Sequence, residues 1–210
     1  MHAKPSKLPA LLRTAAFLLV LALALEGVSA LLRGKNYAAA SRSFYEEPKN
    51  SLDVLLMGSS HMLNAVSPMQ LWEEHGIVSN NLAQNGQVLP VTYYHLQEAL
   101  RYQRPKLIVL DIYKAVQETL IDSKASLHYT LDNMRLGLPK LRAAFDLLPL
   151  GEQAEYLLDV VAYHDRWKEL TEADFRPPDT AEKGAEALFK VKPLPEFRVL
   201  PETETAPPAP

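Results

Sequence analysis

The sequence predicts an α/β protein with a parallel sheet, in a flavodoxin-like three-layer α/β/α sandwich that is preceded by one transmembrane helix. Three strand candidates, at residues 52–57, 77–82 and 107–113, follow one another at similar intervals. Helical patterns fill both intervals, which gives the order βαβαβ. Strands connected in this way pair in parallel through right-handed crossovers. Only helical patterns, at residues 139–148 and 152–163, follow the third strand, so we expect an incomplete sheet.

The first strand ends in a turn that carries reactive side chains. Residues 54–57 are uniformly apolar and too few for an amphipathic helix, so they fit a strand covered on both faces. Gly58 provides the turn. It is followed by Ser59, Ser60 and His61. Ligands in open α/β sheets bind beyond the carboxyl ends of the strands, which makes this turn a candidate site. The alternative is a plain turn with a helix cap.

The helices between the strands have recognisable ends. Ser67 suits an N-cap, Pro68 suits the first helical position, and Gly76 suits a helix stop. The second helix has apolar residues at helical spacing between residues 93 and 100, and Pro105 breaks the chain before the third strand. Each segment between two predicted strands therefore has the length of a single helix and residues that suit its ends.

The N-terminal region predicts a membrane helix. Lys4, Lys7 and Arg13 precede an apolar segment at residues 14–33, and about 20 apolar residues suffice to span a bilayer. We favour a retained signal anchor, although small residues also permit cleavage after Ala30. The larger positive charge before the segment places the N-terminus in the cytoplasm and the rest of the chain outside, in a single-pass topology.

The chain divides into five segments by composition and pattern. They are a basic cytoplasmic tail (1–13), the signal anchor (14–33), a juxtamembrane linker (34–50), the α/β domain (51–175) and a proline-rich tail that is extended or disordered (176–210).

Composition excludes several classes of function. A net charge of −3 and scattered basic residues provide no surface for a nucleic acid. The absence of cysteine excludes disulfides, thiolate metal sites and cysteine nucleophiles. No group of histidines and carboxylates has metal-ligand spacing, and no glycine-rich phosphate loop is present. We therefore expect neither a metal nor another cofactor.

The turn has the residue types of a serine nucleophile. A serine hydroxyl reacts when a base takes its proton and nearby donors bind the developing oxyanion. The backbone amide of Ser60, at a helix start, is one candidate donor. Gly86, with Asn85 beside it, follows the second strand and is the other. Four histidines are assigned to packing, surface, turn or loop positions: His61, His75, His95 and His128. The aromatic residues Trp72, Tyr93, Tyr94 and Tyr102 are assigned to helix-to-sheet packing rather than to a sugar-binding platform.

Several motifs together resemble the SGNH (GDSL-type) hydrolase superfamily, and more narrowly its membrane-anchored bacterial group that carries Gly-Ser-Ser-His. The resemblance covers roughly residues 50–175. Its motifs are at residues 53–61, 67–68, 76–82, 93–94, 98–100, 104–111 and 163–175.

This resemblance implies roles for individual residues. Ser60 matches the nucleophile, Ser59 the aspartate of Gly-Asp-Ser, and Gly86 the oxyanion glycine. The asparagine of the third family block has no counterpart, and no Asp-x-x-His block follows Phe175. We therefore expect the chain to be the N-terminal part of a longer protein. Among the histidines of the chain, His164, with Asp165 beside it, is the best substitute base, and a packed position at a helix end is the alternative for it.

Two functions follow from these observations. The first is a membrane-anchored, extracytoplasmic serine esterase or O-acyltransferase that acts on ester or acyl groups of cell-envelope polysaccharides. The second is a non-catalytic envelope scaffold or binding module that keeps the fold without a complete triad.

Overall fold

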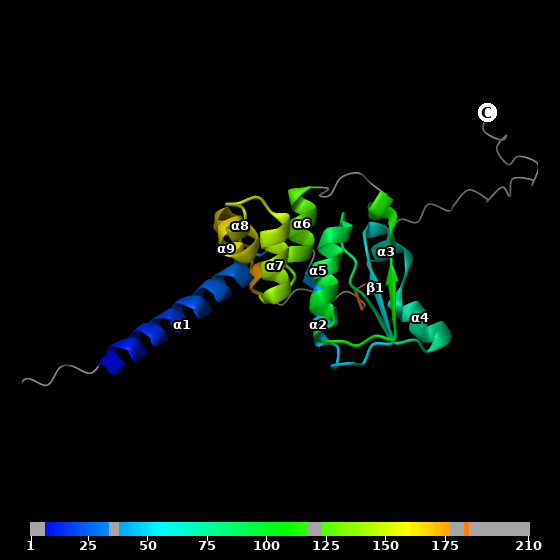
Figure 1. Ribbon diagram of the computed structural model, residues 1–210, viewed down its shortest axis with the longest axis horizontal. Helices are drawn as coiled ribbons and strands as arrows, with labels where there is room; N and C mark the ends of the chain where they lie inside the picture. Colours follow the sequence, from blue (N-terminus) through cyan, green and yellow to red (C-terminus); the bar gives the residue numbers. More distant parts are fainter. Residues whose placement is uncertain (1–6, 34–37, 117–122, 177–182, 185–210) are drawn as a thin grey trace, which may run out of the picture.

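The computed structural model describes residues 7–33, 38–116, 123–176 and 183–184, which form a small parallel sheet among many helices (Figure 1). The strands β1 (Val54–Met57), β2 (Ser79–Asn81) and β3 (Leu107–Leu110) lie in the order β2-β1-β3. The central strand β1 pairs in parallel with both neighbours, so that Leu55 lies opposite Asn80 and Ile108. The mixed α/β class and the parallel pairing predicted from the sequence are confirmed.

All three strands are shorter than predicted. β2 ends at Asn81, whose side-chain amide donates to the carbonyls of Met62 and Val66 at 2.9 and 3.1 Å. β3 ends at Leu110 because the carboxylate of Asp111 accepts from the amide of Tyr113 at 2.8 Å. This local bond turns the chain into the 3-10 helix η1 (Tyr113–Val116).

Helices cover both faces of β1, as the apolar strand predicts. Leu55 and Met57 pack toward α2 (Ala38–Glu46) and α5 (Leu89–Ala99) on one face. Leu56, with Val54, packs toward α3 (Ser60–Ala65) and α4 (Pro68–His75) on the other. The alternation follows from the two-residue period of a strand, and burying each leucine contributes about 2 kcal/mol. Helix α2 lies inside the segment 34–50, where we expected a linker.

The ends of α4 agree with the sequence. The Ser67 hydroxyl accepts from the amide of Gln70 at 3.4 Å, and Pro68 occupies the first helical position. Gly76 follows the helix in the left-handed conformation (φ 66°), which glycine adopts without a Cβ clash.

A second region consists of helices alone. It contains α6 (Lys124–Leu131), α7 (Leu138–Leu147), α8 (Gln153–Leu157) and α9 (Asp159–Tyr163), and it meets the sheet region through α5. The prediction of one helix at residues 152–163 is wrong, because the chain is extended at Leu158 (φ −128°, ψ 96°) and α9 starts anew toward α1. His128, predicted in a loop, lies in α6.

The N-terminal helix α1 (Lys7–Leu32) is long and apolar enough over Ala10–Leu32 to cross a membrane. Most of it projects from the rest of the chain (Figure 1). Its end is held by α9 and the following 3-10 helix η2 (His164–Glu169). Arg33 forms an ion pair with Asp159, and Arg166 donates to the carbonyl of Leu32 at 2.6 Å. These contacts fix α1 to the helical region.

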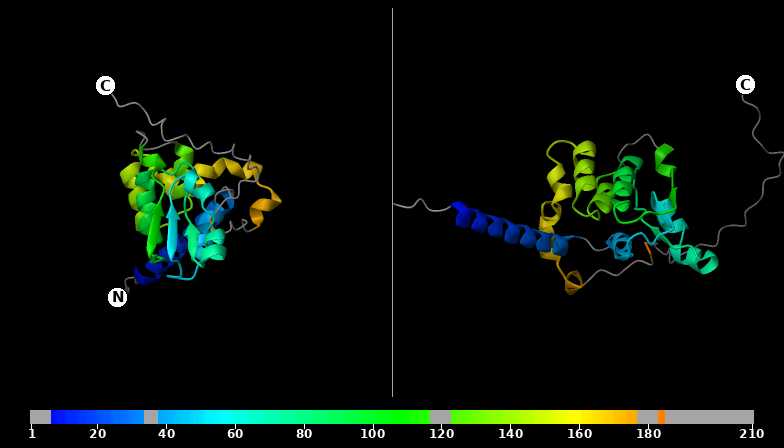
Figure 2. Two further views of the ribbon diagram at one scale, coloured as in Figure 1. Left: turned by 90° about the vertical axis from the view of Figure 1, so that its right-hand side faces the viewer. Right: turned by 60° about the horizontal axis from the view of Figure 1, so that its bottom comes forward.

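The two edges of the sheet differ. The amide of Asn81 in β2 donates to the carbonyl of Lys183 at 2.8 Å, so residues of the predicted tail lie along this edge. The remaining residues of that tail after Arg176 lie outside the described part of the chain. β3 forms the other edge of the sheet (Figure 2). All four of its residues are between 36% and 55% exposed. β3 is therefore an apolar edge strand.

Candidate functional site

The turn after β1 brings the ends of two strands into close contact. The amide of Asp111 donates to the carbonyl of Met57 at 2.9 Å, which places Asp111 beside Gly58. A Cβ added to Gly58 would lie 2.5 Å from the Asp111 Cβ, and the backbone there has a φ of +137°. Only glycine meets both conditions without strain.

Ser59 and Asp111 join these strand ends through a short hydrogen bond. The Ser59 hydroxyl donates to Asp111 Oδ2 at 2.5 Å, and the Ser59 amide donates to the same oxygen at 3.2 Å. Desolvation opposes ionisation of Asp111, but the bonds from Ser59 and from the amide of Tyr113 outweigh it and lower its pKa. Asp111 is therefore an ionised acceptor at neutral pH. Ser59 is buried, and its hydroxyl is fully engaged.

Ser60 is placed differently from Ser59. It begins α3 and is half-buried. Among the residues that the structure describes, none forms a hydrogen bond with its hydroxyl group. The amides of the first helical turn are also without intrahelical partners. Ser60 thus offers a hydroxyl that is free to meet a ligand, whereas Ser59 offers none.

The loop after β2 lies against this turn. The amide of Gln84 donates to the carbonyl of Gly58 at 3.1 Å, and the amide of Leu82 donates to the carbonyl of Leu56 at 2.8 Å. Asn85 and Gly86 are the next residues of this loop, both half-buried, and Gly86 has a φ of +67°. The loop that carries Asn85 and Gly86 is therefore bonded to the turn that carries Ser60, the third predicted oxyanion residue.

The two histidines considered for this site occupy different places. His61 lies at the turn, where its ring contacts the ring of Tyr113 with centroids 4.0 Å apart and its Nδ1 lies 3.3 Å from the Ser59 hydroxyl. His164 is 69% exposed in η2, beside α1, and its Nδ1 donates to the carbonyl of Val161 at 2.9 Å. The structure therefore does not bring His164 to Ser60.

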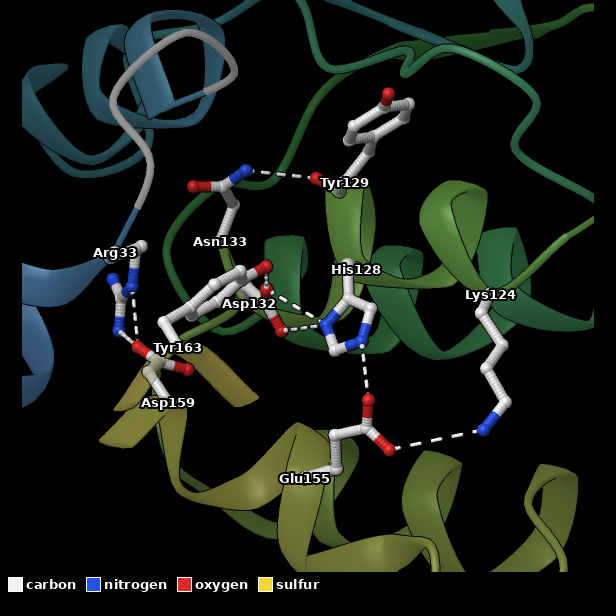
Figure 3. A network of polar contacts seen from close by, with 9 residues as sticks. All are labelled: Arg33, Lys124, His128, Tyr129, Asp132, Asn133, Glu155, Asp159 and Tyr163. Carbon is white, nitrogen blue, oxygen red and sulfur yellow. Dashed lines mark hydrogen bonds and ion pairs between the residues drawn. The ribbon is translucent and has the colours of Figure 1, made fainter. Parts of the chain in front are cut away.

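A second polar cluster, which the sequence analysis missed, lies among the helices (Figure 3). His128 Nδ1 bonds to Asp132 at 3.0 Å, and its Nε2 lies 3.4 Å from Glu155. Tyr163 donates to Asp132, and Tyr156 stacks on the His128 ring at 4.1 Å. A histidine four residues before an aspartate on one helix was the available signal.

The chemistry of this second cluster is that of a closed network. Burial lowers the pKa of His128, but the two carboxylates around it outweigh burial and raise it above its usual value. Burial and the Asp132 carboxylate raise the pKa of Tyr163. Asp132 is 3% exposed. The network joins α6, α8 and α9 and leaves little of Asp132 open to a ligand.

Two aromatic residues and one histidine outside these sites can also be compared with their predicted positions. Trp72 and Tyr93 are 52% and 57% exposed, so their assignment to packing is wrong. His95 is buried, and neither ring nitrogen has a partner among the described residues. Burial lowers its pKa to about 4. Within the described ranges, no three histidines or carboxylates are grouped as metal ligands.

Comparison of the chain with models of protein families, with curated proteins and with solved structures gives no match. The resemblance to SGNH hydrolases stays a prediction that rests on the motifs in the sequence. Function must accordingly be inferred from the site itself.

Proposed function

We propose that this protein is a membrane-anchored, extracytoplasmic serine esterase or O-acyltransferase of the SGNH type, with Ser60 as its nucleophile. The observation that carries the proposal is the contrast between adjacent serines. The Ser59 hydroxyl is buried and bonded to Asp111, while Ser60 is half-buried with a hydroxyl that no described residue engages. A nucleophile must be accessible, and Ser60 is the serine of this turn that meets the condition.

The proposed reaction is acyl transfer through a covalent intermediate. Ser60 Oγ attacks the carbonyl carbon of an ester and loses its proton to a base, and the alcohol departs with a proton to leave an acyl-serine. Water then releases the acid in an esterase, or a sugar hydroxyl takes the acyl group in a transferase. The amides of Ser60 and Gly86, with Asn85 beside them, would bind the oxyanion. Ester or acyl groups of cell-envelope glycans are the proposed substrates.

The order of strands supports the proposed fold family. The sheet β2-β1-β3 corresponds to the first three strands of the flavodoxin-like order 2-1-3-4-5. Ligands in that fold bind beyond the carboxyl ends of the strands, where Gly58, Ser60 and Asp111 lie.

The proposed location follows from α1. Its apolar length suits a single membrane span. The cationic residues Lys4, Lys7 and Arg13 before the apolar segment favour an N-terminus in the cytoplasm. The domain and its site would then face the extracytoplasmic side, where envelope glycans are found.

A specific observation favours a second candidate, a non-catalytic envelope scaffold or binding module. No histidine or carboxylate in the described residues is hydrogen-bonded to Ser60. A serine without a base is a weak nucleophile. In this alternative the Ser59–Asp111 bond serves only to join β1 to β3.

Labelling with a fluorophosphonate probe distinguishes the two candidates. The full chain, purified in detergent, would be treated with the probe and analysed by intact mass, together with Ser60→Ala and the matched control Ser67→Ala. The enzyme proposal predicts one adduct in the wild type and in Ser67→Ala, and none in Ser60→Ala. An unlabelled but folded wild type would favour the scaffold, and labelling that persists in Ser60→Ala would contradict the role of Ser60.

A further inference from the structure

A cavity of about 820 Å³ lies where the end of α1 meets the rest of the chain. One wall is the apolar surface of α1 and includes Ala22, Leu25 and Ala30. The other walls come from α2, from the segment between α6 and α7, from α7, and from the end of α8 with the start of α9. The cavity therefore combines a helix suited to a bilayer with polar groups of the domain.

The charges that line this cavity do not balance. Two ion pairs lie on its walls, Arg33 with Asp159 and Arg42 with Glu46. Three further charged residues line it, and none of them forms an ion pair with a described residue. These are Lys140, Arg135 and Glu26. Two cations and one carboxylate leave an excess of one positive charge, which suits a monoanion.

Lys140 is the most informative of these residues. It lies in the first turn of α7 and is only 3% exposed. No described residue forms a hydrogen bond with its ammonium group. Burial lowers the pKa of Lys140, and the carboxylates of Asp159, Asp132 and Glu98 oppose this at longer range. A buried ammonium is costly without a bonded partner. An anion in the cavity would supply that partner.

Arg135 presents a second cation to the same space. Its guanidinium lies over the ring of Tyr45, 4.3 Å from the centroid, and 5.2 Å from that of Tyr102. Stacking on two aromatic rings holds the group in place while its donors stay available. Arg135 contacts Glu98 through its backbone amide, so this contact does not use the N–H donors of the guanidinium group.

We propose that this cavity binds a phospholipid, with its phosphodiester on Lys140 and Arg135 and its acyl chains along α1. A phosphodiester carries a single negative charge and matches the excess charge of the cavity. Leu25 lines the cavity, and the exposed apolar side chains Leu18 and Leu21 precede the lining residues on α1. The proposal rests on the proposed membrane placement of α1 and is independent of the chemistry at Ser60.

Native mass spectrometry of the full chain in detergent tests the proposal. Phosphatidylglycerol, dioleoylglycerol and inorganic phosphate would each be titrated into the wild type, Lys140→Met and Arg135→Gln. The matched control Arg142→Met removes an exposed cation from the same helix, away from the cavity. We expect saturable binding of phosphatidylglycerol that weakens at least tenfold in both cavity variants and stays unchanged in Arg142→Met. Dioleoylglycerol, which lacks the phosphate, should bind at least tenfold more weakly than phosphatidylglycerol.

Several outcomes would overturn the proposal. Equal binding by wild type and the two cavity variants would remove the role of the cations. Equal binding of dioleoylglycerol would remove the role of the phosphate, and binding of inorganic phosphate alone would overturn the lipid assignment. If circular dichroism shows that Lys140→Met is unfolded, Arg135→Gln decides, because Arg135 is an exposed residue. Ser60→Ala should bind lipid like the wild type, which separates this inference from the proposed activity.

Discussion

Asp111 and Asp132 each accept a hydrogen bond from a hydroxyl group, but they lie in surroundings of different kinds. Asp132 is buried among helices, where His128 and Tyr163 surround its carboxylate. Asp111 is half-buried at the carboxyl end of a strand, where its partners are Ser59 and backbone amides. The first carboxylate belongs to a closed network, and the second borders a turn in which the Ser60 hydroxyl has no partner among the described residues.

The difference shows that residue type alone does not identify a reactive site. The cluster at His128 contains histidine, aspartate and tyrosine within hydrogen-bonding distance, which is the residue set of many catalytic centres. Its carboxylate is nevertheless closed to ligands and ties three helices together. At the turn, no described histidine is bonded to Ser60, but its hydroxyl is accessible. Accessibility therefore separates a candidate site from a structural network here.

Replacing Asp132 should have the largest effect on stability. Asp132→Ala leaves the His128 ring and the Tyr163 hydroxyl without their shared acceptor, and breaking a buried charged pair costs about 3–5 kcal/mol of unfolding free energy. Denaturant titration in detergent, followed by circular dichroism, measures this loss. The control Asp165→Ala breaks an exposed pair with Lys168 and should change the value by less than about 1 kcal/mol. Equal effects would mean that the network is not structural.

Gly58→Ala should destabilise the sheet region by about 3 kcal/mol, because it combines a positive φ with overpacking against Asp111. Gly76→Ala is the matched control. Gly76 also has a positive φ, of 66°, but no atom lies within 4 Å of an added Cβ, so about 1 kcal/mol is expected. The denaturant midpoints of both variants test whether Gly58 and Asp111 approach as closely as described. A similar loss of unfolding free energy in the two variants would contradict this close approach.

Replacing the two serines of the turn should lower the stability of the protein by different amounts. Ser59→Ala removes a hydroxyl that is bonded to an ionised carboxylate and caps α3, which costs about 2 kcal/mol. Ser60→Ala removes a hydroxyl with no described partner and should change stability by less than about 0.5 kcal/mol. Thermal melting of both variants measures the contrast. A larger loss in Ser60→Ala would show that its hydroxyl is a structural group.

Two histidines should give stability opposite dependences on pH. The pKa of His95 is lowered to about 4, so its contribution to stability is present above about pH 6.5 and is lost as pH falls toward 4. The pKa of His128 is raised, so its contribution is complete below about pH 6.5 and is lost as pH rises through that raised pKa. Unfolding measured from pH 4 to 9 should show a reduced acid loss in His95→Leu and a reduced alkaline loss in His128→Asn. Unchanged profiles would contradict both directions.

Local patterns in the sequence predicted much of the sheet region. The apolar residues before Gly58 identified β1, and the order βαβαβ predicted parallel pairing. Ser67 and Gly76 marked the ends of α4 because capping depends on neighbouring residues. The turn with Ser60 was found for the same reason. The role of Asp111 was not predicted, because it depends on two strands whose turn residues are more than 50 positions apart.

The helical region was predicted less well. A break at Leu158 cannot be inferred from local periodicity, because α9 is oriented by the contact of Asp159 with Arg33, 126 positions away. His128 also gained its role from distant partners on α8 and α9. The exposed positions of Trp72 and Tyr93 depended likewise on which helix faces were covered.

The sequence by itself determined the apolar helix at the N-terminus, the parallel α/β class and the glycine turn after β1 that carries Ser59 and Ser60. Each depends on hydrophobic period or on turn chemistry within a few residues. Only the tertiary structure decided which serine is engaged by Asp111, which histidine lies in a closed network, and that Lys140 is buried without a bonded partner among the described residues. Those properties depend on contacts between residues distant in the chain, and burial and charge pairing are set by those contacts.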